Sequence, residues 1–217
     1  MLDRRFRQVA GPRLDALGGR LAGFGLRPDV ITAIGWVVGV GACVAVATGL
    51  WTLALVLWLA NRAFDGLDGP IARAVGATDR GGFFDIVADF SIYGGFVVAV
   101  AIAVPQARLA CLVLLLAYYV SGTAFLTLSS LLERRGQRPD DGVRSLRFVG
   151  GLAEGGETVI TYVLFCLLPG HAATIAWVFA AMVAITAFQR ITLGARLLGV
   201  ASRPTEDDGS TASPDVS

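Results

Sequence analysis

Four aspartates within one short stretch of an otherwise apolar sequence are the residues best suited to chemistry. Asp65 and Asp68 are three positions apart, and Asp85 and Asp89 are four apart. On α-helices both spacings place the paired side chains on one face, about one turn apart. If the two helices are neighbours joined by the short turn at residues 75–80, all four carboxylates meet at one place.

Such a cluster needs positive charge. Carboxylates this close repel one another, and burying ionised acids in or near a membrane is costly unless a cation offsets them. Oxygen ligands without Cys or His favour Mg²⁺ or Mn²⁺ over zinc, and these ions leave positions for phosphate oxygens. The alternative is that the acids pair with Arg62, Arg73 and Arg80 at helix ends. That alternative does not explain two in-phase pairs on adjacent helices.

The elements that must position these acids are membrane helices. The chain has 217 residues, 55% of them hydrophobic and 16% charged, with a mean hydropathy of +0.67, which is outside the balance of a soluble domain. Uncharged stretches at residues 30–51, 109–132 and 172–189 approach or exceed the roughly 20 residues that cross a bilayer. Three more apolar stretches, at residues 52–74, 82–104 and 148–168, are interrupted by acids. We therefore predict an all-α integral membrane protein with six transmembrane helices.

The ends of the chain have a different composition. Residues 1–28 alternate arginines with apolar residues, which predicts an N-terminal amphipathic surface helix; an unstructured basic leader is the alternative. Residues 29–202 form the predicted six-helix transmembrane catalytic domain. Residues 203–217 are polar and acidic, which is typical of a disordered tail.

The basic residues are all arginines, and their distribution predicts an orientation. They gather at both ends and in the connections after the second and fourth predicted spans, whereas Arg108 is alone in its connection. The positive-inside rule then places both termini and the acidic cluster on the cytoplasmic side of a multi-pass cell membrane protein, with the arginines near membrane lipids. His171 falls on the opposite side, which excludes histidine chemistry at the acids. The net charge of +1 gives no support to a nucleic-acid partner.

Glycines next to the acids indicate a binding surface. Gly66, Gly69, Gly81 and Gly82 remove side chains from the walls that face the carboxylates, so that a ligand could approach the backbone. Close helix packing is the alternative interpretation, and we prefer it for Gly35 and Gly39, which have GxxxG spacing.

The pattern Asp65-x-x-Asp68-Gly69-x-x-Ala72-Arg73, followed by Gly81-x-x-x-Asp85-x-x-x-Asp89, resembles the signature of the CDP-alcohol phosphotransferase (CDP-alcohol phosphatidyltransferase) family. The resemblance extends over nearly the whole chain, although the turn between Arg73 and Gly81 is one residue shorter than usual. It implies a metal-dependent homodimeric enzyme of phospholipid biosynthesis. Such an enzyme transfers a substituted phosphate, here a phosphatidyl group, from CDP-diacylglycerol or another CDP-alcohol donor to an alcohol acceptor and releases CMP.

The resemblance also implies roles for individual residues. Asp65, Asp68, Asp85 and Asp89 would hold one or two Mg²⁺ or Mn²⁺ ions, and Asp89 would also be the general base for the acceptor hydroxyl. The cytidine nucleotide pocket would be lined by Gly69, Arg73 and Gly81, together with Asp29 and Thr32.

The acceptor side departs from relatives that use phosphorylated polyols. Those enzymes carry Glu-Arg-x-x-Arg where this chain has Glu154-Gly155-Gly156-Glu157-Thr158, so Thr158 replaces an arginine. Ser129 replaces another basic residue that those enzymes carry near the end of the fourth span, whereas Arg190 is retained. We therefore expect an acceptor without a phosphomonoester. Glu154 and Glu157 share a helix face and could contact an amine or hydroxyl of the acceptor, or could cap the helix and pair with arginines.

Two other function classes fit parts of the sequence. A membrane prenyltransferase also uses aspartates and magnesium on a pyrophosphate, but its acid motifs lie on widely separated helices and it needs more spans. A non-enzymatic cation carrier would be expected to show repeated halves with acids near the middle of the membrane. This chain has one acidic cluster near one face and no second copy of the motif.

Overall fold

The chain folds into long α-helices. A computed structural model describes residues 15–16, 18–23, 27–135, 153 and 155–199, and no strand occurs among these residues. Its main helices are α2 (Pro28–Ala47), α3 (Trp51–Val75), α4 (Asp79–Ala103), α5 (Arg108–Arg134), α7 (Gly155–Leu167) and α8 (Ala172–Gly199). Two short 3₁₀ helices, η1 (Pro105–Ala107) and η2 (Pro169–His171), precede α5 and α8. The predicted all-α class is confirmed for the described part of the chain.

The helix boundaries near the acids follow from local sequence signals. Pro28 opens α2, where its missing N–H would have no intrahelical partner. Gly76 ends α3 with a φ of 101°, a conformation that costs a residue with a side chain. Thr78 caps α4, because its hydroxyl accepts a hydrogen bond from the Gly81 N–H at 3.1 Å. The turn that separates α3 from α4 is therefore short and fixed.

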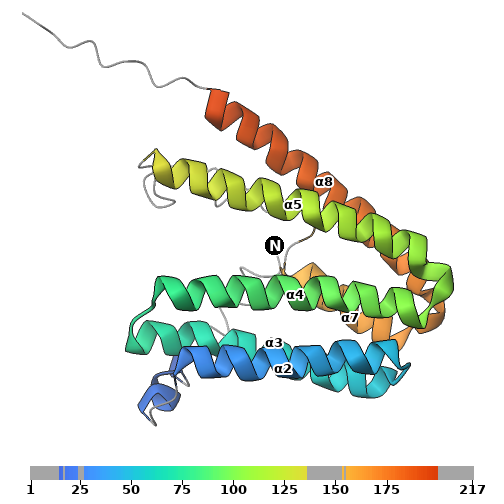
Figure 1. Cartoon of the computed structure of the whole chain (residues 1–217), viewed down its shortest axis with the longest axis horizontal. Helices are drawn as coiled ribbons and strands as arrows, with labels where there is room; N and C mark the ends of the chain where they lie inside the picture. Colours follow the sequence, from blue (N-terminus) through green and yellow to red (C-terminus); the bar gives the residue numbers. More distant parts are fainter. Residues whose placement is uncertain (1–14, 17, 24–26, 136–152, 154, 200–217) are drawn as a thin grey trace, which may run out of the picture.

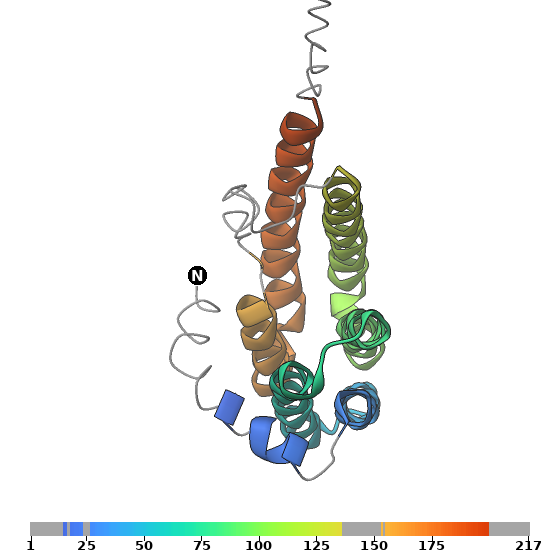
Figure 2. The same cartoon turned by 90° about the vertical axis from the view of Figure 1, so that its left-hand side faces the viewer.

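The helices form two groups that meet at one end of the molecule. Helices α2, α3 and α4 pack against one another, α5 packs along α8, and α7 contacts α3. Figure 1 shows that α5 and α8 diverge from α2, α3 and α4 away from the end that holds η1 and η2. The same separation is visible in the view of Figure 2. The turn between α3 and α4 lies at the diverging end (Figure 1).

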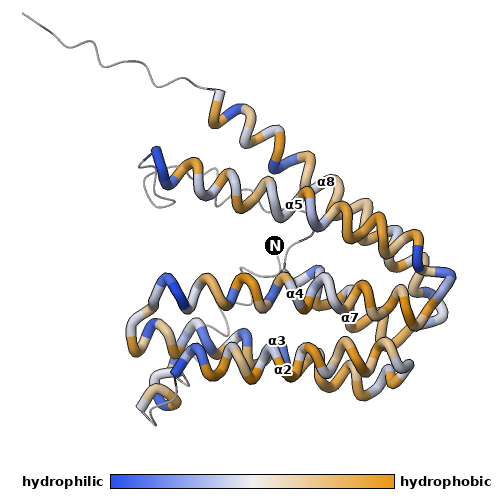
Figure 3. Tube along the Cα trace, in the orientation of Figure 1, coloured by the Kyte–Doolittle hydropathy of each residue, from blue (hydrophilic) through white to orange (hydrophobic). Residues whose placement is uncertain are grey.

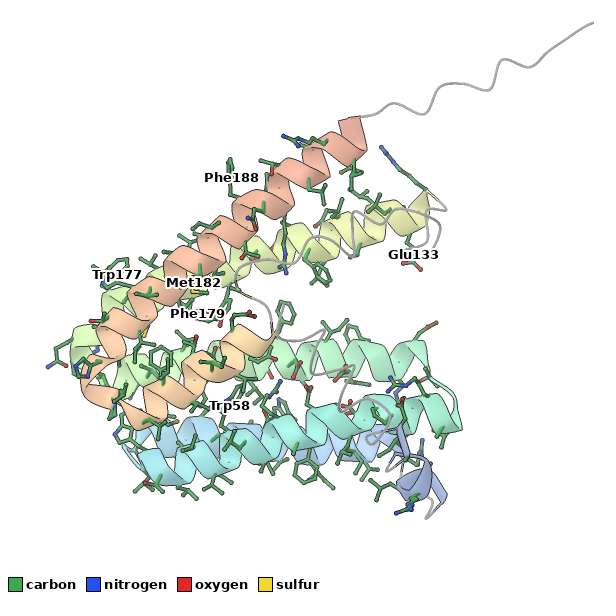
Figure 4. All side chains as sticks on the ribbon, turned by 180° about the vertical axis from the view of Figure 1, so that it is seen from behind. Trp58, Glu133, Trp177, Phe179, Met182 and Phe188 are labelled. Atoms are coloured by element: carbon green, nitrogen blue, oxygen red, sulfur yellow. The ribbon has the colours of Figure 1, made fainter. Side chains whose placement is uncertain are left out.

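Aromatic packing joins α7 to α3 and α4. Trp58, Phe96, Tyr162 and Phe165 are fully buried, and the Phe96 and Tyr162 rings stack with their centroids 4.5 Å apart. The Tyr162 hydroxyl donates to the Tyr93 carbonyl at 2.7 Å, so α7 is tied to α4 by a buried hydrogen bond. Figure 4 shows Trp58 in this core.

Small residues allow α2 to approach its neighbours closely. A Cβ at Gly39 would lie 2.9 Å from the Asn61 side-chain nitrogen and from Ile92, and a Cβ at Gly35 would lie 3.0 Å from Phe64. Larger residues at these positions would force α2 away from α3 and α4. The packing role predicted for Gly35 and Gly39 agrees with these distances.

The outer surface is that of a multi-pass membrane protein. Four stretches among the described helices are long and apolar enough to span a bilayer: Pro28–Ala47, Asp79–Ala103, Pro105–Arg134 and Pro169–Gly199. Their outward side chains include Trp177 and Phe188, which are 47% and 68% exposed. Figure 3 shows polar segments gathered where α3 passes into α4. The predicted tail at residues 203–217 and most of the predicted surface helix lie outside the described residues, although residues 15–16 and 18–23 are helical.

Candidate active site

Three of the four aspartates come together between α3 and α4. Carboxylate oxygens of Asp65, Asp68 and Asp85 all lie within 4.8 Å of one another. Asp68 is the most deeply placed, with 8% of its surface exposed, and the other two are partly buried. The in-phase spacing on each helix therefore produces a shared cluster of oxygen ligands, as the sequence predicts.

Helix α2 orients the deepest of these carboxylates. The Thr32 hydroxyl donates to Asp68 Oδ2 at 3.0 Å, and it also lies 3.2 Å from the Pro28 carbonyl. One hydroxyl has a single proton, so it bonds one of these oxygens at a time. Thr32 was predicted to line a nucleotide pocket, and the structure gives it a direct contact with a cluster aspartate as well.

The fourth aspartate has a different partner. Asp89 accepts a hydrogen bond at Oδ1 from Arg62 NH2 at 2.9 Å, and Arg62 NH1 lies 3.3 Å from Asp65 Oδ2. From the sequence, Arg62 was predicted only as one of three arginines that could pair with the acids. Its position three residues before Asp65, on the same helix face, was the available signal that it points at the cluster.

A pocket of about 440 Å³ opens beside the cluster. Of the residues predicted to bind a nucleotide, Asp29, Thr32, Gly69 and Gly81 line this pocket, together with Asp68 and Asp85. A Cβ at Gly81 would lie 3.3 Å from Asp29 Oδ1, so even alanine there would crowd the wall. The glycines thus keep the space next to the acids open.

Arg73 has a position at the margin of the pocket. Its NH2 group forms an ion pair with Asp15 at 2.6 Å, and both side chains are more than half exposed. Its NH1 group lies 3.5 Å from where a Cβ of residue 69 would be, which places the guanidinium beside Gly69. Arg73 is not among the residues that line the pocket.

The pocket is suited to anionic groups in spite of its acids. Arg27 and Pro28 at the N-terminal end of α2 line it, and so do Thr78, Gly81 and Gly82 at the N-terminal end of α4. The helix dipole favours phosphate at such positions. The N-termini of α2 and α4 therefore face the same pocket that the cluster aspartates Asp68 and Asp85 line.

The donor set fits a hard divalent metal ion. Three carboxylates that can each place an oxygen in a region less than 5 Å across match the all-oxygen ligation of Mg²⁺ or Mn²⁺. Asp89 is not part of this compact group, and its Oδ1 atom is bonded to Arg62. Asp65, Asp68 and Asp85 thus form the compact part of the predicted metal site, and Asp89, the fourth predicted ligand, lies beside them.

The predicted acceptor residues lie on other helices. Arg190 on α8 donates to the Ser121 hydroxyl at 2.9 Å and lies over the Phe125 ring at 5.1 Å, both on α5. Ser129 is exposed further along α5, so Ser121, which was not predicted from the sequence, is the α5 serine that contacts Arg190. Thr158 is buried near the start of α7, in the same turn as the partly buried Glu157. Glu154 lies outside the described residues.

Known proteins share both the sequence and the fold. The chain is 39% identical over 199 residues to the inner membrane protein YnjF of Escherichia coli (strain K12), covering 89% of this chain and 95% of that protein. A crystal structure of Mycobacterium tuberculosis phosphatidylinositol phosphate synthase (PgsA1) with CDP-DAG bound has a TM-score of 0.65 at 23% identity, covering 84% of this chain and 93% of that one. The same synthase in complex with manganese and citrate also gives 0.65, at 22% identity over 83% of this chain and 88% of the other. A model of the CDP-alcohol phosphatidyltransferase family matches residues 26–201, so the resemblance seen in the aspartate signature is confirmed and the chain belongs to this family.

Proposed function

We propose that this protein transfers a phosphatidyl group from CDP-diacylglycerol to the hydroxyl of an alcohol acceptor and releases CMP. The observation that carries the proposal is the set of three clustered carboxylates beside a pocket that two helix N-termini face. Family membership and the CDP-DAG-bound relative support the same donor. A soluble CDP-alcohol is the alternative donor for a pocket of this kind.

The residues of the site would divide the work. Asp65, Asp68, Asp85 and Asp89 would hold Mg²⁺ or Mn²⁺, which would supply Lewis-acid stabilisation of charge on the donor pyrophosphate. Manganese in a relative with the same fold supports a divalent ion here. Gly69, Gly81, Asp29 and Thr32 would line the cytidine nucleotide site, with Arg73 at its edge.

Asp89 would be the general base. It lies one helical turn beyond Asp85 on α4, next to the carboxylates but outside their compact group. From there it would take the proton of the acceptor hydroxyl as the oxygen attacks phosphorus, while the bond to the CMP leaving group breaks.

The proposed membrane arrangement is that of six spans with the active site at the cytoplasmic face. Helix α3 is 25 residues long, which is enough to cross, but it carries the acids and arginines that lower its hydropathy. The described part of α7 has 13 residues. We place residues 1–28 on the cytoplasmic surface as an amphipathic helix, residues 29–202 in the transmembrane domain, and residues 203–217 as a cytoplasmic tail. A homodimer is the proposed assembly.

We propose an acceptor without a phosphomonoester. Thr158 is buried and neutral, Ser129 is neutral, and Arg190 is the retained cation among the aligned acceptor positions. A charge-assisted hydrogen bond contributes about 1.5 to 3 kcal/mol, so two missing cations remove much of the stabilisation that a dianion needs. Glu157, and Glu154 before it, suit an amine or hydroxyl group better than a phosphate.

A CMP-release assay tests the proposal. Purified protein is incubated with CDP-diacylglycerol and Mg²⁺ or Mn²⁺, and with serine, choline, inositol, inositol phosphate, glycerol phosphate or phosphatidylglycerol. CMP release with one of these acceptors, and less than about a tenth of it from Asp68→Asn, is the expected result. Absence of CMP release with every acceptor and with soluble CDP-alcohols would contradict the proposal and favour a prenyltransferase or a cation carrier.

Competition among the acceptors tests the specificity. Equal concentrations are supplied together, and the lipid products are identified by mass spectrometry. A dominant inositol-phosphate or glycerol-phosphate product would refute the acceptor argument without affecting the proposed reaction.

A further inference from the structure

A short helical segment before α2 lies against the end of α3 that carries Asp68. Residues 15–16 and 18–23 are helical, and Figure 2 shows them beside α3. Gly18 is buried in this segment, whereas its neighbour Gly19 is exposed. The segment therefore presents one face to the rest of the protein, and Gly18 lies on that face.

Gly18 allows the segment to approach the backbone of α3 closely. A Cβ at Gly18 would lie 2.5 Å from Pro70 Cβ and 2.8 Å from the Pro70 carbonyl carbon. These neighbours are a ring carbon and a backbone atom, which cannot rotate away as the end of a flexible side chain would. A Cβ at Gly19, by contrast, would meet no neighbour within 4 Å. The contact thus depends on the absence of a side chain at position 18.

The same face of the segment reaches the pocket one turn further along. Ala22, four residues after Gly18, lines the pocket of about 440 Å³ together with Asp68 and Gly69. Residues four apart are neighbours on one face of a helix. Pro70, on which Gly18 packs, directly follows Gly69 in α3. The contact between Gly18 and Pro70 therefore sets the distance between this segment and the pocket residues of α3.

An ion pair is the second attachment of the segment. Arg73 NH2 donates to Asp15 Oδ1 at 2.6 Å. Arg73 is three residues after Pro70, and Asp15 is three residues before Gly18, so the two attachments are about one turn apart. Both charged side chains are more than half exposed, and water screens such a pair, so it stabilises the position weakly. The segment is therefore held mainly by the packing of Gly18 on Pro70.

We propose that Gly18 is a positioning residue for donor binding, which seats the segment on Pro70 so that Ala22 forms a wall of the nucleotide pocket. The inference rests on the proposed function, in which this pocket takes the cytidine nucleotide of the donor. The pyrophosphate would lie at the aspartates and the diacylglycerol in the bilayer, which leaves the cytidine for a wall at the membrane surface. Gly18 does not itself touch the donor, because it acts through the position of Ala22.

A methyl group at position 18 would displace this wall. Carbon atoms that are not bonded prefer separations of about 3.5 to 4.0 Å, so Gly18→Ala requires a shift of about 1 Å. The segment should move and α3 should not, because α3 also packs against α2 and α7. The wall affects the binding of the donor and not the reacting groups. We therefore expect KM to rise while kcat and metal affinity stay the same.

The experiment compares wild type with Gly18→Ala and the matched control Gly19→Ala. Both variants add the same methyl group and the same helix propensity, so they differ in the contact with Pro70. The readouts are kcat and KM for CMP release from CDP-diacylglycerol, and the affinities for Mn²⁺ and for CMP in the presence of Mn²⁺, measured by calorimetry. We expect Gly18→Ala to raise KM and weaken CMP binding about 10-fold, with unchanged kcat and Mn²⁺ affinity. Gly19→Ala should match wild type in every readout.

Ala22→Leu tests the wall directly and leaves Gly18 in place. Its longer side chain would enter the pocket, so this variant should also weaken CMP binding. It decides the question if Gly18→Ala does not fold, which the thermal unfolding midpoint reports. Unchanged CMP affinity in Ala22→Leu would show that Ala22 is not a wall of the nucleotide pocket, and the inference would be overturned.

Two other results would also overturn the inference. One is the same KM and CMP affinity in Gly18→Ala and Gly19→Ala. The other is a loss of kcat or of Mn²⁺ affinity in Gly18→Ala, which would mean that α3 has moved with its aspartates. Both leave the proposed reaction intact, because the wild type is active in each case. A wild type that binds CMP but releases none from CDP-diacylglycerol would instead refute the proposed function, and the CMP affinities of the variants would still test the wall.

Discussion

Replacing Asp68 by asparagine separates two effects on stability, which are the repulsion among the clustered carboxylates and the stabilisation by a bound metal ion. Asp68 has carboxylate neighbours in Asp65 and Asp85, with oxygens within 4.8 Å. Two unit charges at that distance repel by about 3.5 kcal/mol at an effective dielectric constant of about 20. Asp68→Asn removes two such repulsions and keeps an amide oxygen for the Thr32 hydroxyl. Because Arg62 and water screen the cluster, we expect a net gain on the order of 1 kcal/mol for the metal-free protein.

Thermal unfolding in detergent, with EDTA or with Mn²⁺, measures both effects. In EDTA the wild type should have the lower unfolding midpoint. Mn²⁺ should raise this midpoint, because an ion at 100 times its Kd stabilises the folded state by about 2.7 kcal/mol. Asp68→Asn should have a higher unfolding midpoint in EDTA, and Mn²⁺ should change that midpoint little. Its CMP release should fall below about a tenth of wild type, a loss of more than about 1.4 kcal/mol in transition-state stabilisation. Asp79→Asn, an exposed aspartate in the first turn of α4, is the matched control.

Two results would refute this account. The first is that Asp68→Asn is less stable than wild type in EDTA and that Mn²⁺ still raises its unfolding midpoint. In that case the carboxylates neither destabilise the metal-free protein by repulsion nor bind the ion. If Asp65→Asn, Asp68→Asn and Asp85→Asn each keep more than about a tenth of wild-type turnover, the ligand assignment is wrong.

Three other changes test single parts of the site. Asp89→Asn should still bind the CDP donor, measured by calorimetry, but should not release CMP; loss of donor binding with retained chemistry would disprove the base assignment. Thr32→Val should weaken Mn²⁺ binding about 10-fold, because the hydroxyl orients Asp68, whereas Thr48→Val, which loses bonds to backbone carbonyls only, should not; equal affinities in both variants would contradict this role. Gly81→Leu should fill the pocket wall and raise KM for CDP-diacylglycerol with normal Mn²⁺ affinity, and an unchanged KM would count against the nucleotide pocket.

The acidic cluster could be predicted because its signal is local. Spacings of three and four residues place each pair of aspartates on one helix face, and a short connection makes the two helices neighbours. The turn is held by Gly76 and Thr78, whose residue types are typical of a helix end and a helix cap. The prediction that these carboxylates meet needed no residue outside 65–89.

Contacts between distant helices could not be predicted in the same way. Arg62 reaches Asp89 across 27 positions of sequence, and Arg190 reaches Ser121 across 69. Both depend on the rotation and depth of each helix, which packing determines and periodicity does not. For the same reason Ser129 was predicted as the acceptor-site residue of α5. It lies exposed two turns beyond Ser121, which is the serine that contacts Arg190.

One face of α3 serves both packing and chemistry. Along this face, at alternating spacings of three and four, lie a core aromatic, a buried amide, two cluster aspartates and a pocket-lining alanine: Trp58, Asn61, Asp65, Asp68 and Ala72. The buried amide bonds the Gly35 carbonyl, and a Cβ at Gly39 would collide with it. These contacts hold α2 against α3 one turn or more from the aspartates, and on the same helix α2 carries Thr32 to Asp68. A side chain that pushed α2 outward would therefore withdraw the hydroxyl from the carboxylate, so Gly35 and Gly39, which do not line the 440 Å³ pocket, contribute to the geometry of the site.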